Sequence, residues 1–413
     1  MWRELINDFL QDLNAQRTRS FLTIMAMTWG TIAVVLLLSF GEGLGTQMLN
    51  GLLNAGNQIM ILYGGETGMA YDGIPKGRRI ELNEEDASLL LAAIPTIAQV
   101  TPQYRATVRL TVGKNSSNTE CEGVDPNFEE MRRMYPAAGG RFLNAHDVAA
   151  QRRVLVLGDE IAADLFGKQD PIGQIVMVER VPFTVIGILQ AKIQTSMNNG
   201  PDRRRAIMPN ATMRMMFGWQ HVNSLVVRPG DPRRQEEVKK EIFRVLARKY
   251  HFHPEDDRTL FIWDFIENEK MSRKVGTGVE MFLFGVGFLT LLIAGVGVAN
   301  VMYVVVKERT REIGIRLAVG ARRRHIHAQF IFEALLLAAI GGILGMLVSW
   351  GVIAIVHLFP SDSGAMQFLG KPILSPGTML LTGGVLMVIG LLAGYFPARR
   401  AAAVDPVESL RYE

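Results

Sequence analysis

Two charged stretches lie directly against long apolar segments of this chain: residues 307–322, KERTREIGIRLAVGAR, and residues 394–413, GYFPARRAAAVDPVESLRYE. Each stretch places basic and acidic side chains at the end of an apolar run. A membrane protein needs this arrangement if a soluble partner is to act on it from one side of the bilayer. The two stretches therefore predict a membrane protein with a charged surface at one face.

Four apolar runs are long enough to cross a bilayer: residues 21–40, 281–306, 330–359 and 378–396. The first contains no charge and spans about 30 Å as a helix, which matches the thickness of a bilayer core. A cleaved signal peptide is the alternative for this run. That alternative is disfavoured because the run exceeds the usual apolar length of about 7–15 residues and no A-x-A-like site follows it. The sequence predicts four transmembrane helices.

Basic residues near the ends of the spans set the predicted orientation. Residues 307–327 carry seven lysines and arginines, whereas the loop between the last two spans carries one, Lys371. We therefore expect a multi-pass protein of the cell (inner) membrane with both termini in the cytoplasm. The predicted segments are a cytoplasmic N-terminal helix (1–20), span one (21–40), an extracytoplasmic domain with stalk helices at both ends (41–280), span two (281–306), a cytoplasmic coupling segment (307–329), span three (330–359), an external loop (360–377), span four (378–396) and a cytoplasmic tail (397–413).

The extracytoplasmic domain is predicted to be α/β (α+β), inserted between helices one and two. Strands are expected at residues 107–112, 153–157, 183–188 and 224–228, because these are short runs rich in β-branched residues. Asn83 and Asp86 predict a helix that runs to Ile94. Asp231 and Pro232 predict another, with Asp as N-cap and Pro at the first position, that runs to Lys249. Residues 41–57 and 264–280 have helical character and extend spans one and two.

Composition and motifs exclude several classes of chemistry. The chain has 413 residues, 48% of them apolar, and a net charge of +4, with the positive residues beside apolar runs, which favours a membrane over nucleic acid. Cys121 is the one cysteine, so this chain builds no internal disulfide and no thiolate zinc site. No G-x-x-x-x-G-K-[ST] loop occurs, and Gly41-Glu42-Gly43-Leu44-Gly45 lacks its lysine. We predict no catalytic, cofactor-binding or metal-binding residue in this chain.

Small residues recur four apart within three of the spans. The pairs are Gly295 and Ala299, Gly341 and Gly345, and Gly390 and Gly394. Such spacing lets two helices approach closely. Two interpretations stay open, packing within one bundle and a face that dimerises.

The cytoplasmic coupling segment combines helix-forming residues with charges of both signs. Glu308 and Glu312 are four apart and share a helical face, and Gly320 is expected to end the helix. Apolar residues between them supply a strip that rests on the membrane or on a partner: Ile313, Ile315, Leu317 and Val319. A helix that lies on the membrane and only anchors the span ends is the alternative. A lever driven by a soluble motor is the other interpretation.

These motifs resemble those of the MacB/FtsX-like, or type VII, permeases of ABC transporters. The similarity is carried by E-R-T-R-E-I-G-I-R-x-A-x-G-A-R at 308–322, by the terminal segment from Pro397, and by Gly41-Glu42-Gly43 after span one. The outer domain is similar to a MacB-like periplasmic core domain at 154–158, 165–167, 171–174 and 185–187. Residues 28–31, Thr-Trp-Gly-Thr, depart from the small aliphatics more usual in the family.

The resemblance implies a permease moved by ATP hydrolysis in two copies of an ABC ATPase subunit. MacB itself carries a fused N-terminal ATPase, whereas this chain begins about twenty residues before span one, so we expect a separate motor that holds the ATP and magnesium. The resemblance assigns the ATPase contact to eight residues: Glu308, Arg309, Arg311, Glu312, Gly314, Arg316, Gly320 and Ala321.

Further partners implied by the resemblance are a second copy of this or a related permease, membrane lipid, a periplasmic adaptor and an outer-membrane channel, with no nucleic acid. Efflux of drugs, peptides or lipidic substrates is the expected function. Lipoprotein release and non-transporting mechanotransmission to a cell-wall hydrolase are the alternatives. In each case this chain alone is expected not to be an enzyme.

Overall fold

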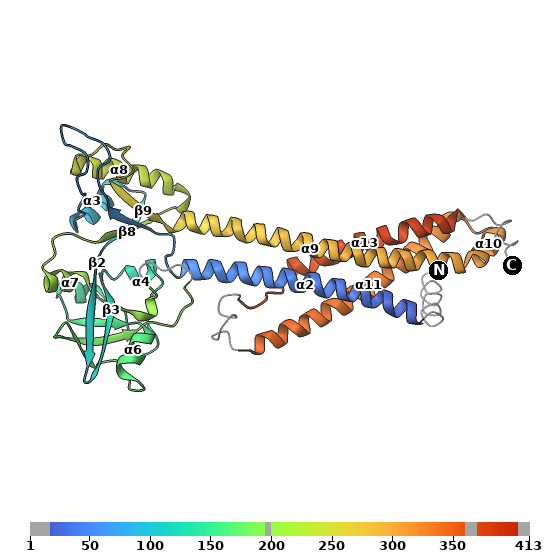
Figure 1. Cartoon of the computed structure of the whole chain (residues 1–413), viewed down its shortest axis with the longest axis horizontal. Helices are drawn as coiled ribbons and strands as arrows, with labels where there is room; N and C mark the ends of the chain where they lie inside the picture. The colour runs from blue at the N-terminus through green and yellow to red at the C-terminus, as the bar shows by residue number, and fades with distance from the viewer. Residues whose placement is uncertain (1–16, 195–199, 360–369, 404–413) are drawn as a thin grey trace. The chain divides into compact units, whose positions relative to one another are not determined.

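The computed structural model describes residues 17–194, 200–359 and 370–403. The chain divides into two compact units (Figure 1). The helical unit comprises the chain up to Gln47 and from Lys274 onward, and the head is Met48–Arg273. Each unit has a hydrophobic core of its own.

Four long helices build the helical unit: α2 (Arg17–Leu53), α9 (Phe265–Glu308), α11 (Arg323–Leu358) and α13 (Pro376–Ala402). Each is long and apolar enough to cross a membrane. Each predicted span lies within one of these helices, except that span three ends at Phe359, one residue after α11. The prediction of four apolar helices is confirmed. Their length follows from long runs of Leu, Ile, Val and Ala without an interior break.

α2, α9 and α13 extend beyond the predicted spans at both ends, and α11 does so at its start. α2 continues to Leu53 and α9 begins at Phe265, so the polar stretches next to spans one and two are helical over these residues, as expected. α13 continues past Phe396 through Pro397. A proline inside a helix removes one backbone hydrogen bond, but buried alanines on the same turns, Ala398 and Ala401, pack into the core of the helical unit and hold the helix together. The predicted segments 1–16 and 404–413 lie outside the described residues.

The glycine-rich stretch at 41–45 lies within α2 and is a packing site. A side chain on Gly41 would meet Leu283 of α9, and one on Gly43 would meet the backbone of Lys371. The backbone N–H of Ile373 donates to the Ser39 carbonyl at 2.9 Å. The small residues therefore let the segment before α13 lie directly against α2, and the stretch is no phosphate loop.

Nine strands in the described part of the head form one sheet, in the order β3-β7-β4-β6-β5-β2-β8-β1-β9. Their bounds are β1 Met60–Gly64, β2 Ile97–Val112, β3 Asn115–Val124, β4 Val154–Leu157, β5 Ile175–Val178, β6 Val181–Ile188, β7 Arg205–Pro209, β8 Ser224–Pro229 and β9 Leu260–Asp264. Four of these contain the predicted strands. β3 pairs in parallel with β7, and β4 with β6; the other pairings are antiparallel.

Strand β2 belongs to both halves of the head. Its first part, through Gln103, pairs with β8, and its second part, from Tyr104, pairs with β3. Because β2 also pairs with β5 at Leu110 and Thr111, six strands close on themselves as β2-β3-β7-β4-β6-β5. We call this closed part the barrel half, and β2-β8-β1-β9 the open-sheet half. In Figure 1, α3 and α8 accompany β8 and β9, whereas α6 and α7 accompany β3.

A continuous apolar core fills the barrel half and extends under the open sheet. It contains Phe183, Val108 and the single cysteine, Cys121, which has no exposed surface. Burial raises the pKa of the Cys121 thiol, and the nearby carboxylates of Glu122 and Glu120 raise it further. Cys121 is therefore a structural side chain.

Six α-helices and two 3-10 turns accompany the described strands: α3 (Glu85–Ala93), α4 (Phe128–Met131), α5 (Ala145–Ala149), α6 (Asp159–Phe166), α7 (Asn210–Phe217), α8 (Gln235–Tyr250), η1 (Asp202–Arg204) and η2 (Pro232–Arg234). The helix predicted from Asp231 begins later than expected. Asp231 accepts a hydrogen bond from the Arg233 N–H at 2.9 Å, but it caps the short turn η2, and α8 follows at Gln235.

The start of α3 differs from the prediction in which residue supplies the cap. The side chain of Asn83 does not cap the helix; the carboxylate of Asp86 accepts the Asn83 N–H at 2.7 Å. Asp86 is fully buried and also accepts from the Tyr250 hydroxyl at 2.6 Å and pairs with Lys249 at 2.5 Å. The residue thus ties α3 to the end of α8.

Candidate coupling site

A short helix, α10 (Thr310–Ala318), connects α9 to α11. The break lies at Arg309, whose φ of −94° and ψ of 13° leave the helical region. The Thr310 hydroxyl donates to the Lys307 carbonyl at 2.8 Å, which satisfies one acceptor at the end of α9. At the other end Gly320 has a φ of +102°, which only glycine adopts without strain. The predicted helix and its glycine stop are confirmed.

One face of α10 packs into the helical unit. Ile313 and Gly314 are buried, and Leu317 packs against the same core. This face fixes α10 to the helices that it connects.

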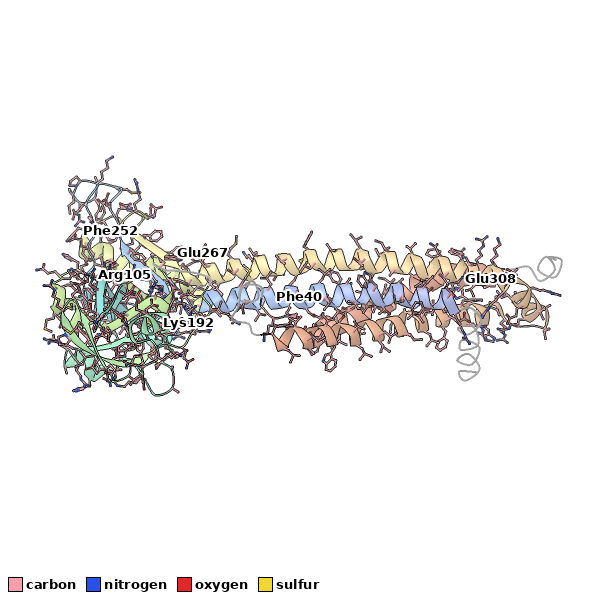
Figure 2. The ribbon with its side chains drawn as sticks, turned by 60° about the horizontal axis from the view of Figure 1, so that its bottom comes forward. Phe40, Arg105, Lys192, Phe252, Glu267 and Glu308 are labelled. Atoms are coloured by element: carbon pink, nitrogen blue, oxygen red, sulfur yellow. The ribbon has the colours of Figure 1, made fainter. Side chains whose placement is uncertain are left out.

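A salt bridge joins the end of α9 to the start of α2. The two guanidinium nitrogens of Arg19 lie 3.0 and 3.1 Å from the two carboxylate oxygens of Glu308 (Glu308 is labelled in Figure 2). The two side chains are 33% and 44% exposed, so the pair contributes at most about 1 kcal/mol of stability. Its geometry nevertheless fixes which helices meet at this end.

A chain of polar side chains joins α10 to α11. Arg316 donates to Glu312 at 2.5 Å and to Gln329 at 2.9 Å, and Gln329 donates to Glu333 at 3.2 Å. Arg309 lies 3.6 Å from the Glu333 carboxylate. Glu333 is nearly buried, so its charge depends on these partners.

No role was predicted for Glu333 or Gln329 from the sequence. The signal that could have found them is the rarity of a carboxylate within an apolar run, where it needs a partner of opposite charge.

The opposite face of α10 is exposed. Arg311, Ile315 and Val319 lie four residues apart, which places them on one stripe. Ile315 is 46% exposed and Val319 is 85% exposed. Exposed arginines 322, 323 and 324 follow at the start of α11. An apolar pair surrounded by basic side chains is suited to contact with a protein partner that has an acidic rim.

The eight predicted coupling residues therefore separate into groups. Arg311 is exposed on the outward stripe, Gly314 is buried, Gly320 forms the turn, and Ala321 is partly buried after it. The other four are engaged in interactions within the chain: Glu308, Arg309, Glu312 and Arg316. The predicted apolar strip is divided: Ile315 and Val319 lie on the outward stripe, whereas Ile313 and Leu317 pack into the core of the helical unit.

The six predicted packing residues all lie at contacts between helices of one chain. An added side chain at Gly341 would meet Met27, and one at Gly345 would meet Thr31, both on α2. Gly390 and Gly394 face Ala338 and Ala334 of α11, Gly295 faces Ile389 of α13, and Ala299 packs against the same core. These positions serve packing within the bundle, and a dimer face through them stays a prediction.

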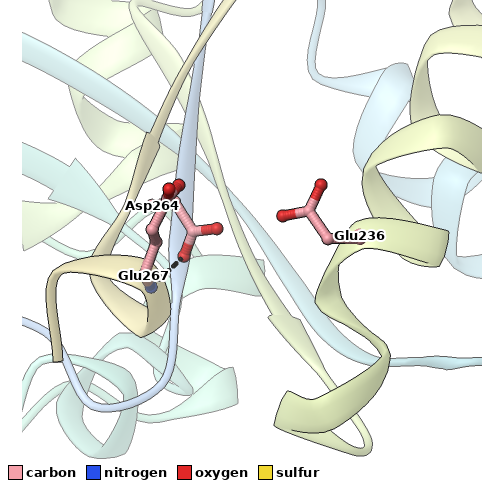
Figure 3. A group of neighbouring side chains, drawn as sticks. All are labelled: Glu236, Asp264 and Glu267. Atoms are coloured by element: carbon pink, nitrogen blue, oxygen red, sulfur yellow. Dashed lines mark hydrogen bonds between the residues drawn. The ribbon is translucent and has the colours of Figure 1, made fainter. Parts of the chain in front are cut away.

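One group of carboxylates in the head has the spacing of a metal site. The carboxylates of Glu236, Asp264 and Glu267 lie within 4.8 Å of one another (Figure 3). The ammonium of Lys239 is 2.8 Å from Glu236, 2.7 Å from Asp264 and 3.7 Å from Glu267, so a cationic side chain of this chain already contacts all three carboxylates. Asp264 also accepts the N–H groups of Ile266 and Glu267 and so caps the start of α9.

Comparison with known proteins identifies two matched regions. Residues 20–245 match the model of the MacB-like periplasmic core domain, and residues 284–406 match that of the FtsX-like permease C-terminal region. Among curated relatives, a macrolide export ATP-binding/permease protein MacB of Bdellovibrio bacteriovorus is 29% identical over 99% of this chain and 62% of its own length.

Two further relatives and one solved structure are also similar to parts of this chain. The MacB of Rhodospirillum rubrum is 32% identical over 98% of this chain and 59% of its own length. The pyoverdine export protein PvdT of Pseudomonas aeruginosa is 28% identical over 95% and 56%. The periplasmic region of MacB from Actinobacillus actinomycetemcomitans is 21% identical, with a TM-score of 0.43, over 54% of this chain and 96% of that structure. This chain thus spans about three fifths of the length of these curated relatives.

Proposed function

This chain belongs to the family of ABC transporter permeases that join a MacB-like periplasmic core domain to an FtsX-like C-terminal region, and from this premise we propose that α10 couples it to an ATPase subunit. ATP hydrolysis in that subunit would move α10, and the long helices would carry the motion to the extracytoplasmic head. The observation that supports this most directly is the exposed stripe of Arg311, Ile315 and Val319 beside an otherwise anchored helix.

The proposed contact differs from the one expected from the motif alone. The apolar pair Ile315 and Val319 supplies the area that a partner can bury, and burial of apolar surface is what stabilises such a contact. Arg311 and the arginines at 322–324 supply the charges that orient the partner. Glu308 and Glu312 act indirectly. Glu308 joins the end of α9 to the start of α2, and Glu312 pairs with Arg316, which donates to Gln329 of α11.

The anchored face of α10 explains how a push there would reach the helices. Arg316 and Arg309 join it to Gln329 and Glu333 of α11, and Glu308 joins the end of α9 to α2. A force on the exposed stripe would therefore act on three long helices together. In the orientation that we propose, α10 and both termini are cytoplasmic, because the basic residues gather at these ends.

The names of the relatives support export as the function of this chain. The names of the similar proteins state macrolide export and pyoverdine export. We propose efflux of a drug, peptide or lipidic compound, with a second copy of the permease, a periplasmic adaptor and an outer-membrane channel as further partners. Lipoprotein release and mechanical activation of a cell-wall hydrolase are the alternative functions of the same coupling.

The test replaces one side chain of the exposed stripe. Val319→Asp places a charge in the proposed apolar contact, and Ile175→Asp makes the same change at a 60% exposed position of the head. We expect Val319→Asp to reduce ATP hydrolysis that co-purifies with the permease at least tenfold, while Ile175→Asp leaves it within twofold. Equal hydrolysis with both variants would refute the assignment of the contact.

A further inference from the structure

Lys192 holds four oxygen atoms from three separate parts of the head. Its ammonium lies 2.8 Å from the Asn54 carbonyl, 2.8 Å from the Arg132 carbonyl and 3.1 Å from the Arg133 carbonyl. It also lies 2.8 Å from the Asp202 carboxylate, and its side chain is 14% exposed. An ammonium has three protons to donate, so this environment saturates it. Surface lysines do not collect partners in this way.

One of those carbonyls ends helix α2. Asn54 follows Leu53, the last residue of α2, and a helix end leaves its final carbonyls without helical partners. A cation placed there is favoured by the helix dipole. The contact is reciprocal, because the Asn54 side-chain amide donates to the Ile193 carbonyl at 2.8 Å. Lys192 and the last turn of α2 lie side by side in Figure 2.

The fourth partner belongs to a buried ionic cluster of the barrel half. Asp202 lies 3.1 Å from Arg132 and 3.6 Å from Arg205, and Arg205 is paired with Glu122. Arg205 begins β7 and Glu122 lies on β3, which are neighbouring strands of the barrel half. Lys192 therefore connects the end of α2 to the barrel half through one carboxylate.

The start of α9 is held by the other half. Asp264, which caps α9, pairs with Lys239 of α8, and α8 packs with α3 in the open-sheet half. Both helix ends pack into one apolar cluster that contains Leu52 and Phe265, but their ionic clamps come from different halves of the head. Strand β2 is shared by both halves and is the element about which they would turn.

We propose that Lys192 is a positioning residue that makes the barrel half follow α2, while the clamp at Lys239 makes the open-sheet half follow α9. A displacement of α2 against α9 would then change the angle between the two halves. This inference rests on the proposed function, in which ATP hydrolysis moves these helices.

The experiment measures distances between spin labels in the full chain with its ATPase partner. The distance between labels at Asn50→Cys on α2 and Ser116→Cys on β3 reports movement of the barrel half relative to α2. The distance between labels at Asn50→Cys and Arg248→Cys on α8 reports movement of the open-sheet half relative to α2. All three positions are exposed. In the otherwise unaltered chain we expect the first distance to stay within about 2 Å when vanadate traps the nucleotide, and the second to shift by more than that.

Lys192→Met is the test variant and Lys249→Met is the matched control. Lys249 also pairs with a buried carboxylate, Asp86, but at the contact of α3 with α8. We expect Lys192→Met to broaden the Asn50–Ser116 distribution at least twofold without nucleotide, and Lys249→Met to leave it unchanged. If Lys192→Met does not accumulate, Asn54→Ala removes only the bond to Ile193 and should broaden the same distribution more weakly.

The outcomes separate the two proposals. Equal distributions in Lys192→Met and the parent chain, or equal broadening in both lysine variants, would overturn the role of Lys192. An Asn50–Ser116 distance that shifts on trapping as much as Asn50–Arg248 would overturn it as well. If vanadate trapping shifts neither distance, the ATP-driven motion of the proposed function fails, whereas the nucleotide-free comparison still decides the role of Lys192.

Discussion

Two ion pairs, one in the helical unit and one in the head, differ in how deeply they are buried. At the end of the helical unit, Arg19 pairs with Glu308, and about a third or more of each side chain is exposed. In the head the pair between Arg205 and Glu122 is exposed by 1% and 0%. An exposed pair is screened by water and is weak, whereas a buried pair cannot lose one partner without leaving an unpaired charge in an apolar setting.

The difference shows what holds each region together. The long helices are held by close approach at small residues, with ion pairs at one end that join α10 to its neighbours. Loops of the head, such as residues 190–194, are held by buried ions. The helical unit should therefore be sensitive to added volume, and the head should be sensitive to the removal of a charge.

The largest effect is expected from Arg205→Met in the head. The substitution leaves the buried carboxylate of Glu122 without the arginine that pairs with it, and removes the most distant of the three cations around Asp202. We expect a loss of about 3–5 kcal/mol of stability, measured as a lower melting temperature of the purified full chain. Glu160→Gln, at the exposed pair with Arg204, is the control and should cost less than about 1 kcal/mol. Similar losses for both would contradict the contrast between buried and exposed pairs.

An intermediate effect is expected from Gly341→Leu in the helical unit. An added Cβ would lie 2.6 Å from the Cβ of Met27 on α2, so the helices must separate. Overpacking of this kind costs about 1–3 kcal/mol, measured by thermal unfolding in detergent. At Gly351 on the same helix an added Cβ meets nothing within 4 Å, so Gly351→Leu should not lower the melting temperature. If both variants behave alike, close packing does not position these helices.

The smallest effect is expected from Asp125→Asn in the head. Burial raises the pKa of Asp125 to about 6, and its ordinary value is near 4. Between these values the folded chain binds more protons than the unfolded chain, so stability falls as pH rises through this window. The asparagine removes the charge and should raise stability at pH 7 by about 1–2 kcal/mol. The gain should vanish below about pH 4, and an equal gain at both pH values would refute this explanation.

Much of the helical unit could be predicted because its signals are local. Length and uninterrupted apolar composition identify a span, and the glycine at 320 marks the end of α10 without any knowledge of the fold. Four strands and the two longer helices of the head were predicted for the same reason. The start of α8 was missed because Pro232 favours the first position of a helix but equally suits the short turn before it.

The contacts that define the candidate site could not be predicted because they join distant parts of the sequence. Arg19 and Glu308 are separated by 289 positions, and no periodicity connects them. Lys192 follows a strand and looks like an ordinary loop lysine until Asn54 and Asp202 are brought to it. The sequence of β2 indicates one continuous strand. Its two parts belong to different halves of the head, which only their pairing with β8 and β3 reveals.

The complete burial of Cys121 makes its thiol a probe of the native state. A thiol with no exposed surface and a raised pKa reacts with a reagent only while the surrounding strands are transiently apart. The rate at which the Cys121 thiol is modified therefore reports how often the barrel half opens. Cysteines introduced at exposed sites would react far sooner, so both signals can be followed in one sample.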